Sequence, residues 1–301
     1  MQSEPDSRGK VSNLQNVVRD VACTVCGCVC DDLIVTSDAG RIVRADGACA
    51  LAEPWFAAQG RSQRPVSCVD GTETDLASAV QAAADILSSS SLPLLYGLSR
   101  SSTPGQRAAI ALGDRLGGIV DTTASRCHAP SIMALQQVGE STCSLGEVRQ
   151  RSDVVVYWGA NPLRSHPRHL ERYAGEPEGT FVPRGRADRH IVVVDPNATE
   201  TAAIADTHLQ VAPGRDFELL WDLRARLAGQ TDDVSPAHGI PAEQVDAFAE
   251  RIRTARYGIV FFGLGLTRGT VGHQDVEALL LMVRDAHRHT RWSARRMRIP
   301  G

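Results

Sequence analysis

The chain has 301 residues, of which 43% are hydrophobic and 22% are charged, and its formal net charge is −3 at pH 7. These values describe a globular protein with a sizeable core, which we expect to be divided between two subdomains. The small negative charge gives no electrostatic reason for binding nucleic acid or an anionic membrane, and no apolar run reaches the length of a membrane span.

Residues 1–20 are polar and contain no apolar core of signal-peptide length. We therefore expect them to form a polar lead-in, and we expect the protein to reside in the cytoplasm. In that reducing compartment, clustered cysteines favour metal binding over disulfide formation.

Four of the eight cysteines lie within eight consecutive residues, from Cys23 to Cys30. Cys23, Cys26 and Cys30 follow a C-x2-C-x3-C spacing, and eighteen residues separate Cys30 from Cys49. Such a loop lets several thiolates converge on one inorganic core, and a distant cysteine completes the ligand set, which favours an iron–sulfur cluster. A zinc site, a redox pair and buried structural thiols are the alternatives, although a zinc ribbon usually has a second C-x2-C and none follows. Cys28 fits none of the required spacings.

Two short β-strands are predicted next, at 33–35 and 41–43, joined by a turn over 37–40. Together with the cysteine loop and Cys49 they would form a small β cap that carries the cluster. We assign this iron–sulfur cap to residues 21–64.

Beyond the cap, helices alternate with strands. Apolar residues at helical spacing predict a helix over 75–88, and a strand follows at 92–96. Thr103-Pro104 is typical of the start of a second helix, and Gly117-Gly118 of its end.

The remaining strands are apolar throughout, and each ends in small or polar residues. These strands are predicted at 153–158, 191–194 and 258–262. Helices are predicted around 165–173, 198–205, 214–228 and 241–254, an exposed loop over 176–188, and a polar stretch over 229–239. Such an alternation indicates an α/β domain over residues 65–301, with a doubly wound parallel sheet covered on both faces.

Three strand ends carry residues suited to a ligand, and ligands bind beyond the carboxyl ends of strands in such sheets. Asn161 and Thr199 can hydrogen-bond a phosphate or a ribose, and Asp195 suits ribose hydroxyls or a purine edge. The turn Gly263–Gly269 reads GxGxxxG, one residue off the dinucleotide fingerprint, so a simple NAD site is poorly supported. Glycine turns also end strands in many proteins that bind nothing. We predict that the three turns together form a ligand site.

Cys127 is the second sulfur feature, and it lies between Arg126 and His128 just after a short strand. The two basic neighbours would lower the pKa of the thiol and make it a good nucleophile or metal ligand. A buried structural cysteine beside a surface histidine is the alternative.

His166 and His169 are three residues apart on a predicted helix that also carries Arg164 and Arg168. Two histidines at this spacing can bind a metal, and the arginines suit an anion better. A solvated basic face is an equal alternative.

In combination, these motifs resemble the molybdopterin-dinucleotide oxidoreductases. The resemblance rests on the C-x2-C-x3-C loop and on the segments Gly-Ala-Asn-Pro (159–162), His-Pro-Arg (166–168), Val-Asp-Pro (194–196) and Pro-Gly-Arg-Asp (213–216). One branch is more closely similar, the B subunit of formylmethanofuran dehydrogenase and of the related bacterial formyltransferase/hydrolase complex. That similarity is carried by 127–131, 142–148, 153–158 and 166–169.

The resemblance implies one [4Fe-4S] cluster, and a tungsten or molybdenum ion held by two pterin guanine dinucleotides. It implies that the cluster ligands are Cys23, Cys26, Cys30 and Cys49. Cys127 would ligate the tungsten or molybdenum, and His128 would handle protons or orient the substrate. The residues that would hold a pterin dinucleotide are Asn161, Asp195, Thr199, Gly263, Gly265 and Arg268.

In this family the metal centre interconverts CO2 and formate while the cluster relays electrons. A separate subunit transfers the formyl group to or from a methanofuran-type carrier. The resemblance therefore implies partner subunits and a role in one-carbon metabolism.

Relatives of this type run on for about a further hundred residues. We therefore expect that this chain is truncated at its C-terminus and lacks part of the second pterin site. The bacterial counterpart can be a scaffold without metal, which gives a second hypothesis, a cofactor-free structural subunit. The presence of all five candidate ligand cysteines favours the redox hypothesis. A zinc-stabilised α/β binding protein is the third.

Overall fold

The chain forms two compact units, Met1–Pro65 and Val66–Gly301. The computed structural model describes residues 15–60, 66–99, 101–230, 237–269 and 271–297, without the side chains of Arg126 and Cys127. The polar lead-in up to residue 14 and the centre of the polar stretch predicted over 229–239 lie outside the described residues.

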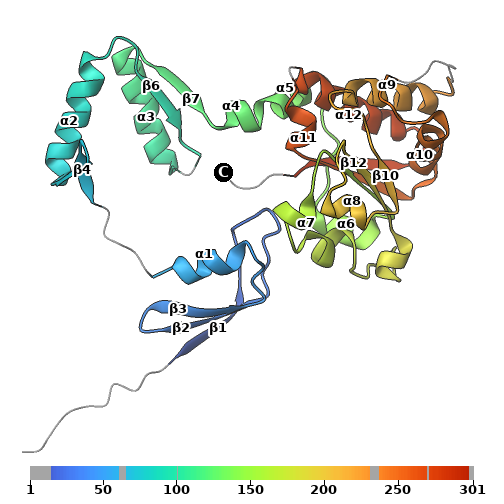
Figure 1. Cartoon of the computed structure of the whole chain (residues 1–301), viewed down its shortest axis with the longest axis horizontal. Coiled ribbons are helices and arrows are strands. Elements are labelled where there is room, and N and C mark those ends of the chain that lie inside the picture. Colours follow the sequence, from blue (N-terminus) through green and yellow to red (C-terminus); the bar gives the residue numbers. More distant parts are fainter. Residues whose placement is uncertain (1–14, 61–65, 100, 231–236, 270, 298–301) are drawn as a thin grey trace, which may run out of the picture. The chain divides into compact units, whose positions relative to one another are not determined.

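The described part of the first unit is a three-stranded antiparallel sheet followed by a helix (Figure 1). The strands pair in the order β1-β2-β3. Their bounds, with that of the helix, are β1 (Asn16–Val21), β2 (Leu33–Asp38), β3 (Arg41–Asp46) and α1 (Ala52–Ala58). Strands β2 and β3 confirm the two predicted strands, whereas β1 uses residues that the sequence had assigned to the polar lead-in.

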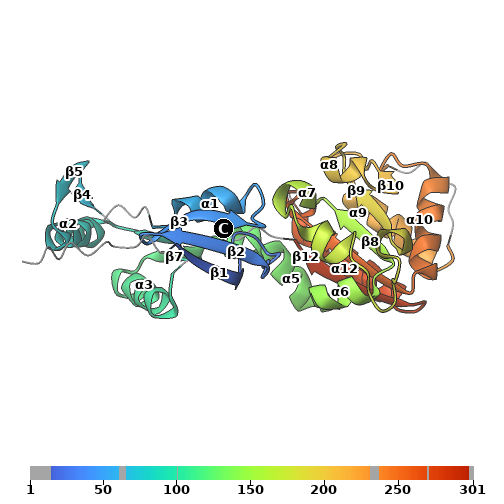
Figure 2. The same ribbon diagram turned by 90° about the horizontal axis from the view of Figure 1, so that it is seen from below.

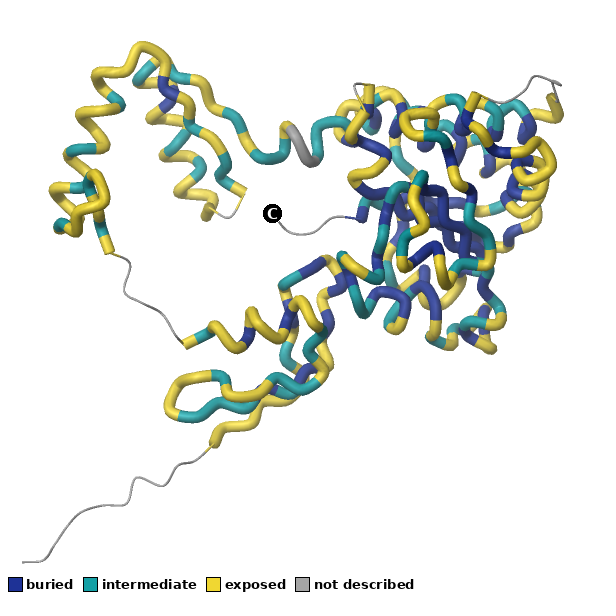
Figure 3. The backbone as a smooth tube through the Cα atoms, in the orientation of Figure 1, coloured by how far each residue is buried: buried dark blue, intermediate teal, exposed yellow. Residues whose placement is uncertain are grey.

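The second unit begins with an α/β segment over residues 66–122. Its elements are β4 (Ser67–Val69), β5 (Thr72–Thr74), α2 (Leu76–Ser89), β6 (Leu94–Gly97), α3 (Thr103–Leu116) and β7 (Ile119–Thr122). As predicted, α3 has a proline in its first turn, and it ends at Gly117 in the left-handed conformation. Helix α2 buries none of its residues, and Leu76, Val80 and Ile86 on it are more than half exposed (Figure 3).

Five parallel strands form the main sheet of the second unit (Figure 2). They are β8 (Val154–Trp158), β9 (His190–Val194), β10 (Thr207–Leu209), β11 (Tyr257–Phe262) and β12 (Arg291–Arg296), in the order β10-β9-β8-β11-β12. Every residue of β8 and of β11 is buried. A strand with both faces covered must be apolar throughout, and the parallel sheet predicted from those runs is confirmed.

Alternate residues of β8 face two separate hydrophobic cores. Val154, Val156 and Trp158 belong to one core, together with residues of α5 (Ala129–Val138), α9 (Asp216–Leu227), α10 (Ala242–Thr254) and α12 (Gly272–Ala286). Val155 and Tyr157 belong to the other, with residues of α6 (Leu145–Arg151), α8 (Glu200–Ala203) and the π-helix Leu170–Ala174. Helices therefore cover both faces of the sheet, as in a doubly wound α/β domain (Figure 1).

Parts of this unit differ from the prediction. A short α7 (Pro162–Ser165) and the π-helix replace the helix predicted around 165–173, because the backbone at His166 leaves the helical region. Strand β12 was missed because its sequence, RWSARR, is rich in arginine, a composition that edge strands use to prevent pairing with other chains. The loop predicted over 176–188 is anchored by the fully buried Val182 and includes a 3-10 helix, Gly185–Asp188.

Replacement of Gly258 tests how tightly the edge of this sheet is packed. A Cβ atom at Gly258 in β11 would overlap the ring of Trp292 in β12, which is fully buried and has no room to move. We expect Gly258→Ala to lower the free energy of unfolding by about 2 kcal/mol or more, measured by urea denaturation. The control is Gly146→Ala in α6, where the nearest atom is 3.7 Å from the added Cβ, and it should be neutral or slightly stabilising. Equal losses in both variants would contradict this packing.

Candidate functional site

The strand order of the main sheet reverses between β8 and β11, and this switch point is where open α/β sheets bind ligands. The two turns that follow these strands touch backbone to backbone. Gly265 donates its N–H to the carbonyl of Gly159 at 3.0 Å. A Cβ atom at Gly265 would lie 2.7 Å from Cα of Gly159, and one at Gly263 would overlap the carbonyl of Gly159. Gly263 and Gly265, predicted to hold a pterin dinucleotide, are therefore required by the packing of the two turns.

The predicted site residues Asn161 and Thr199 come together at the ends of β8 and β9, but they bond to protein groups. Asn161 donates from Nδ2 to Glu200 and accepts at Oδ1 from the hydroxyl of Thr201, at 2.7 Å. Thr199 caps α8 by accepting the N–H of Ala202 at 3.1 Å. Both side chains thus fix the start of α8 against the turn after β8.

Of the other two predicted side chains, Asp195 is buried and Arg268 is exposed. Asp195 follows β9 and is buried, and its carboxylate accepts both the backbone N–H (2.9 Å) and the side-chain amide (3.2 Å) of Asn197. Arg268 directly follows α11 (Leu264–Thr267) and is exposed. Within the described residues, no carboxylate forms an ion pair with Arg268.

Two carboxyl groups at the switch point, the half-buried Asp216 and the buried Asp275, were missed by the sequence reasoning. Asp216 begins α9 and accepts a 2.7 Å hydrogen bond from the indole of Trp158, the last residue of β8. Asp275 lies in the first turn of α12, and only 9% of it is exposed. Burial raises the pKa of Asp216. Burial, with the nearby Asp216 and Glu218, raises the pKa of Asp275 to about 6.

These carboxyl groups suit a ligand that offers N–H donors, such as an amide or a purine edge. The carboxyl group of Asp275 accepts no hydrogen bond from the described residues, although the residue is almost fully buried. The sequence signal for both carboxyl groups was an acidic residue in the first turn of a helix that comes after a strand. Helix α9 comes after β10 in the chain, and α12 comes after β11. Of the two, only the Pro-Gly-Arg-Asp segment that ends at Asp216 was noted, as part of a family resemblance.

The interpretation of His166 and His169 as a solvated basic face is wrong. His166 is 3% exposed and His169 is 2% exposed, and the His169 ring packs edge-on against Phe261 at 4.7 Å between centroids. Burial lowers the pKa of His169 to about 3, helped by His166 and Arg295. The turn around the π-helix directs these rings into the core, so His169 is neutral and contributes to packing.

The cysteine loop of the first unit connects β1 to β2 and is closed by a 2.7 Å hydrogen bond from the N–H of Cys23 to the carbonyl of Cys30. Its four cysteines are all buried, and Cys28, which fits no ligand spacing, is buried the most, at 1% exposed. A hydrogen bond from Cys28 lowers the pKa of Cys26 to about 6. The same hydrogen bond, burial and the charges of Cys26, Cys30 and Cys49 raise the pKa of Cys28. Cys28 therefore lies at the centre of the thiols.

Cys49 reaches this group from the segment between β3 and α1, and its carbonyl accepts the N–H groups of Ala52 and Glu53 at the start of the helix. Among the described residues, no three His, Cys, Asp or Glu side chains are grouped so that they could hold a metal ion. The ligand assignments of Cys23, Cys26, Cys30 and Cys49 stay predictions.

Cys127 ends the short α4 (Ala124–Cys127), and His128 joins it to α5. The side chain of Cys127 lies outside the description, so its assignment as a ligand stays a prediction. The other cysteines of this unit are Cys143, which is buried and whose pKa is raised by burial, and Cys68, which is exposed on β4.

No protein-family model matches the chain. The chain is 36% identical over 289 residues to the B subunit of tungsten-containing formylmethanofuran dehydrogenase 2 from Methanocaldococcus jannaschii, and 35% identical over 289 residues to the protein of that name from Methanococcus maripaludis. These alignments cover 94% of this chain and 66% and 67% of the relatives, so the chain spans about two thirds of their length.

Solved structures are similar as well. The formyltransferase/hydrolase complex FhcABCD from Methylorubrum extorquens, solved with methylofuran, matches with a TM-score of 0.59 and 26% identity over 77% of this chain and 60% of that chain. Acetylene hydratase from Pelobacter acetylenicus matches with a TM-score of 0.58 and 14% identity over 88% of this chain and 43% of that chain, a likeness of fold alone. No helix among the described residues has the length and apolar character that crossing a membrane requires.

Removal of the charge at Asp275 tests the electrostatics of the switch point. A carboxyl group whose pKa rises from 3.8 to about 6 on folding costs stability as the pH increases through that range. We expect Asp275→Asn to raise the free energy of unfolding at pH 7.5 by on the order of 2 kcal/mol in the cofactor-free chain, and to change it little at pH 4. Urea denaturation at both pH values measures this.

The matched control is Glu277→Gln, which removes a more exposed acid from the same helix. It should leave the pH dependence of stability unchanged. If Asp275→Asn were neutral at pH 7.5, Asp275 would not be under electrostatic strain.

Proposed function

The chain belongs to the family of formylmethanofuran dehydrogenase B subunits, and from this premise we propose that it fills that position in a formylmethanofuran dehydrogenase-like complex. The proposed reaction interconverts CO2 and formate at a tungsten- or molybdenum-pterin centre. A partner subunit would couple it to formyl transfer to or from a methanofuran-type carrier. The similarity to oxidoreductases over nearly the whole chain supports an oxidoreductase-related role.

The thiol loop is the observation that carries the redox part of this proposal. Four buried thiols are gathered in one loop, and Cys49 lies within electrostatic reach of Cys28. The pKa of Cys28 is raised first by its hydrogen bond to Cys26 and by burial, and then by the charges of Cys26, Cys30 and Cys49. Thiolates held this close repel one another, and a cationic iron–sulfur core would remove that repulsion. The donor set is sulfur only, which suits iron–sulfur clusters or zinc rather than magnesium or calcium. A cluster is wider than a single ion, so its ligands need not already converge on one point.

In this proposal Cys23, Cys26, Cys30 and Cys49 ligate a [4Fe-4S] cluster. Cys28 remains beside them as a buried thiol that donates to Cys26. A hydrogen bond to a ligand sulfur is one of the factors that set the reduction potential of a cluster.

The switch point of the main sheet would hold the nucleotide end of a pterin dinucleotide. The half-buried Asp216 and the buried Asp275 would accept the N–H groups of a guanine, and Asp195 is suited to a purine edge or to ribose hydroxyls. The turn over 263–269 would lie beside a phosphate of that nucleotide, as the family resemblance implies. Asn161, Thr199 and Arg268 complete the set, as the family resemblance implies.

Cys127 would ligate the tungsten or molybdenum, as a soft thiolate suits. When bound, this group would supply the two-electron exchange between CO2 and formate. His128 lies next to Cys127 at the start of α5, where its imidazole would accept or donate the proton of that exchange.

A cofactor-free structural subunit of a formyltransferase/hydrolase complex is the second candidate function. The observation that favours it is the internal bonding of Asn161 and Thr199 and the packing role of Gly265. All three have a structural purpose without a ligand. The similarity to the FhcABCD structure supports either candidate.

Iron analysis of the complex separates the two candidates. We expect the anaerobically purified complex to contain about four iron and four acid-labile sulfide per copy of this chain. Cys23→Ser should lose most of both, and should also lose the visible absorption of the cluster. Cys68→Ser, which replaces an exposed thiol on β4, is the matched control and should retain both. A wild-type complex without iron and sulfide, whose activity survives Cys23→Ser, would leave only the structural role.

Metal and pterin content of Cys127→Ser tests the second cofactor. We expect the wild-type complex to carry tungsten or molybdenum and a fluorescent pterin after oxidation, and the variant to lose the metal. Cys143→Ala, which removes a buried thiol with no proposed ligand role, should retain the metal. Metal content and CO2/formate exchange both unchanged in Cys127→Ser would exclude the proposed role of Cys127.

A further inference from the structure

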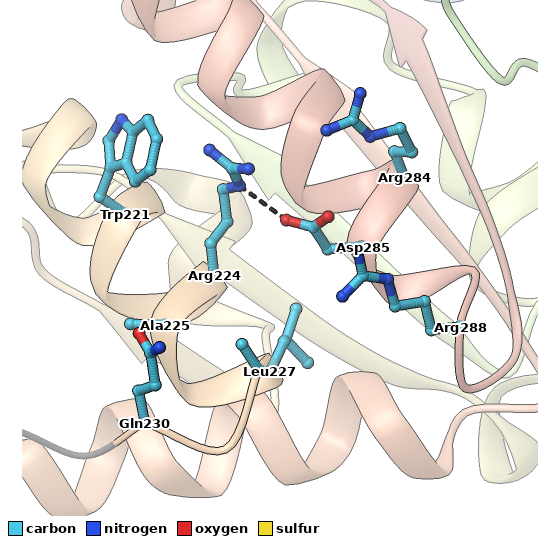
Figure 4. A pocket seen from close by; sticks show the side chains of 9 residues that line it. Trp221, Arg224, Ala225, Leu227, Gln230, Arg284, Asp285 and Arg288 are labelled. Atoms are coloured by element: carbon cyan, nitrogen blue, oxygen red, sulfur yellow. Dashed lines mark hydrogen bonds and ion pairs between the residues drawn. The ribbon is translucent and has the colours of Figure 1, made fainter.

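A cavity of about 280 Å³ lies between the second halves of α9 and α12 (Figure 4). Both helices begin at the carboxyl ends of strands, where Asp216 and Asp275 lie in their first turns. The cavity is therefore separate from the switch point. Its lining residues are Trp221, Arg224, Ala225, Leu227, Ala228, Gln230, Arg284, Asp285 and Arg288.

Arg224 is fixed in this cavity by two contacts. Its Nε donates to Asp285 at 2.7 Å, and its guanidinium stacks 4.2 Å from the centroid of the Trp221 ring. The Nη1 atom of Arg224 is buried and has no hydrogen-bond partner among the described residues. A buried donor without an acceptor costs free energy, and an incoming carboxylate is the group that would satisfy it.

The charge of the cavity is positive. Arg284 lies on α12 and Arg288 in the turn that follows it (Figure 4), and within the described residues neither forms an ion pair. Three guanidinium groups and a single carboxylate, that of Asp285, thus line the cavity. The cavity is complementary to an anion that carries more than one negative charge.

An aromatic surface adjoins the cavity. Trp221 is 46% exposed and Phe217 is 37% exposed, and their rings lie 5.9 Å apart on α9. They line a second cavity of about 210 Å³, with Ala278 and Leu281 of α12. Its one charged lining residue is Glu277. A small anion would gain nothing from contact with this apolar surface, whereas a polypeptide can bury an apolar side chain on it.

We propose that this α9–α12 surface docks an acidic segment of a neighbouring subunit of the complex. Carboxylates of the segment would pair with Arg224, Arg284 and Arg288, and an adjacent apolar side chain would pack on Trp221 and Phe217. Tryptophan and arginine are the residues that most often dominate protein–protein interfaces. The inference rests on the proposed role of the chain as a member of a multi-subunit complex.

A lysine substitution tests the surface directly. Lys10 is the only lysine of the chain, so Arg288→Lys introduces a second lysine amine and keeps the positive charge. Carbodiimide joins an amine to a carboxylate only when the two are in contact. We expect the purified complex that contains Arg288→Lys to yield a cross-link between position 288 and an Asp or Glu of another polypeptide, located by mass spectrometry.

Arg251→Lys is the matched control, because Arg251 is exposed on α10 and lines a different cavity. It should give no such cross-link. If position 288 links only to Asp285 or to another carboxylate of the same chain, or if Arg251→Lys links equally well, the proposal is overturned. A chain that purifies without any other subunit overturns the proposed function as well, so the two failures are distinguishable.

Charge reversal measures how much the surface contributes. We expect two variants, the double substitution Arg284→Glu and Arg288→Glu and the single substitution Trp221→Ala, to bind the neighbouring polypeptide about tenfold or more weakly. The affinity is measured by titrating each variant chain against the other subunits of the complex. High salt should weaken the wild-type contact in the same direction. Arg251→Glu should have no effect. Unchanged affinity in both test variants would overturn the proposal.

Discussion

The contact between the turns after β8 and β11 is the constraint on which the second unit depends. Gly159 and Gly263 donate their N–H groups to the ends of neighbouring strands, and Gly265 donates to Gly159. A side chain at any of these positions would push the turns apart where the strand order reverses. Helices α9 and α12 begin at this edge, so the positions of Asp216 and Asp275 follow from the same close approach.

Features that depend only on a local sequence pattern could be predicted from the sequence. The continuously apolar runs of β8 and β11 indicated the parallel sheet, and the proline and glycine at its ends indicated α3. Features that depend on a distant partner could not be predicted. Strand β12 is recognisable only beside β11, and the burial of His169 depends on a π-helix that no helical periodicity indicates.

The site was predicted in part for the same reason. Asp195, Asn161 and Thr199 follow predicted strands, so their place at one edge of the sheet was foreseeable. The hydrogen bond that Asp216 accepts was not foreseeable, because its donor is Trp158, 58 residues earlier. Cys28 was set aside because spacing rules consider only ligands, whereas the fold of the loop makes it the most buried of the four thiols.

The exposed apolar surface of the 66–122 segment affects how this chain must be handled. Helix α2 buries no residue, and Leu94, Tyr96 and Ile119 of the adjacent strands β6 and β7 are also about half exposed or more. Unshielded apolar surfaces of this kind promote self-association and retention by chaperones. The yield of soluble material should therefore depend on what is co-expressed with the chain. Failed preparations of the chain alone would reflect colloidal instability rather than a defective fold.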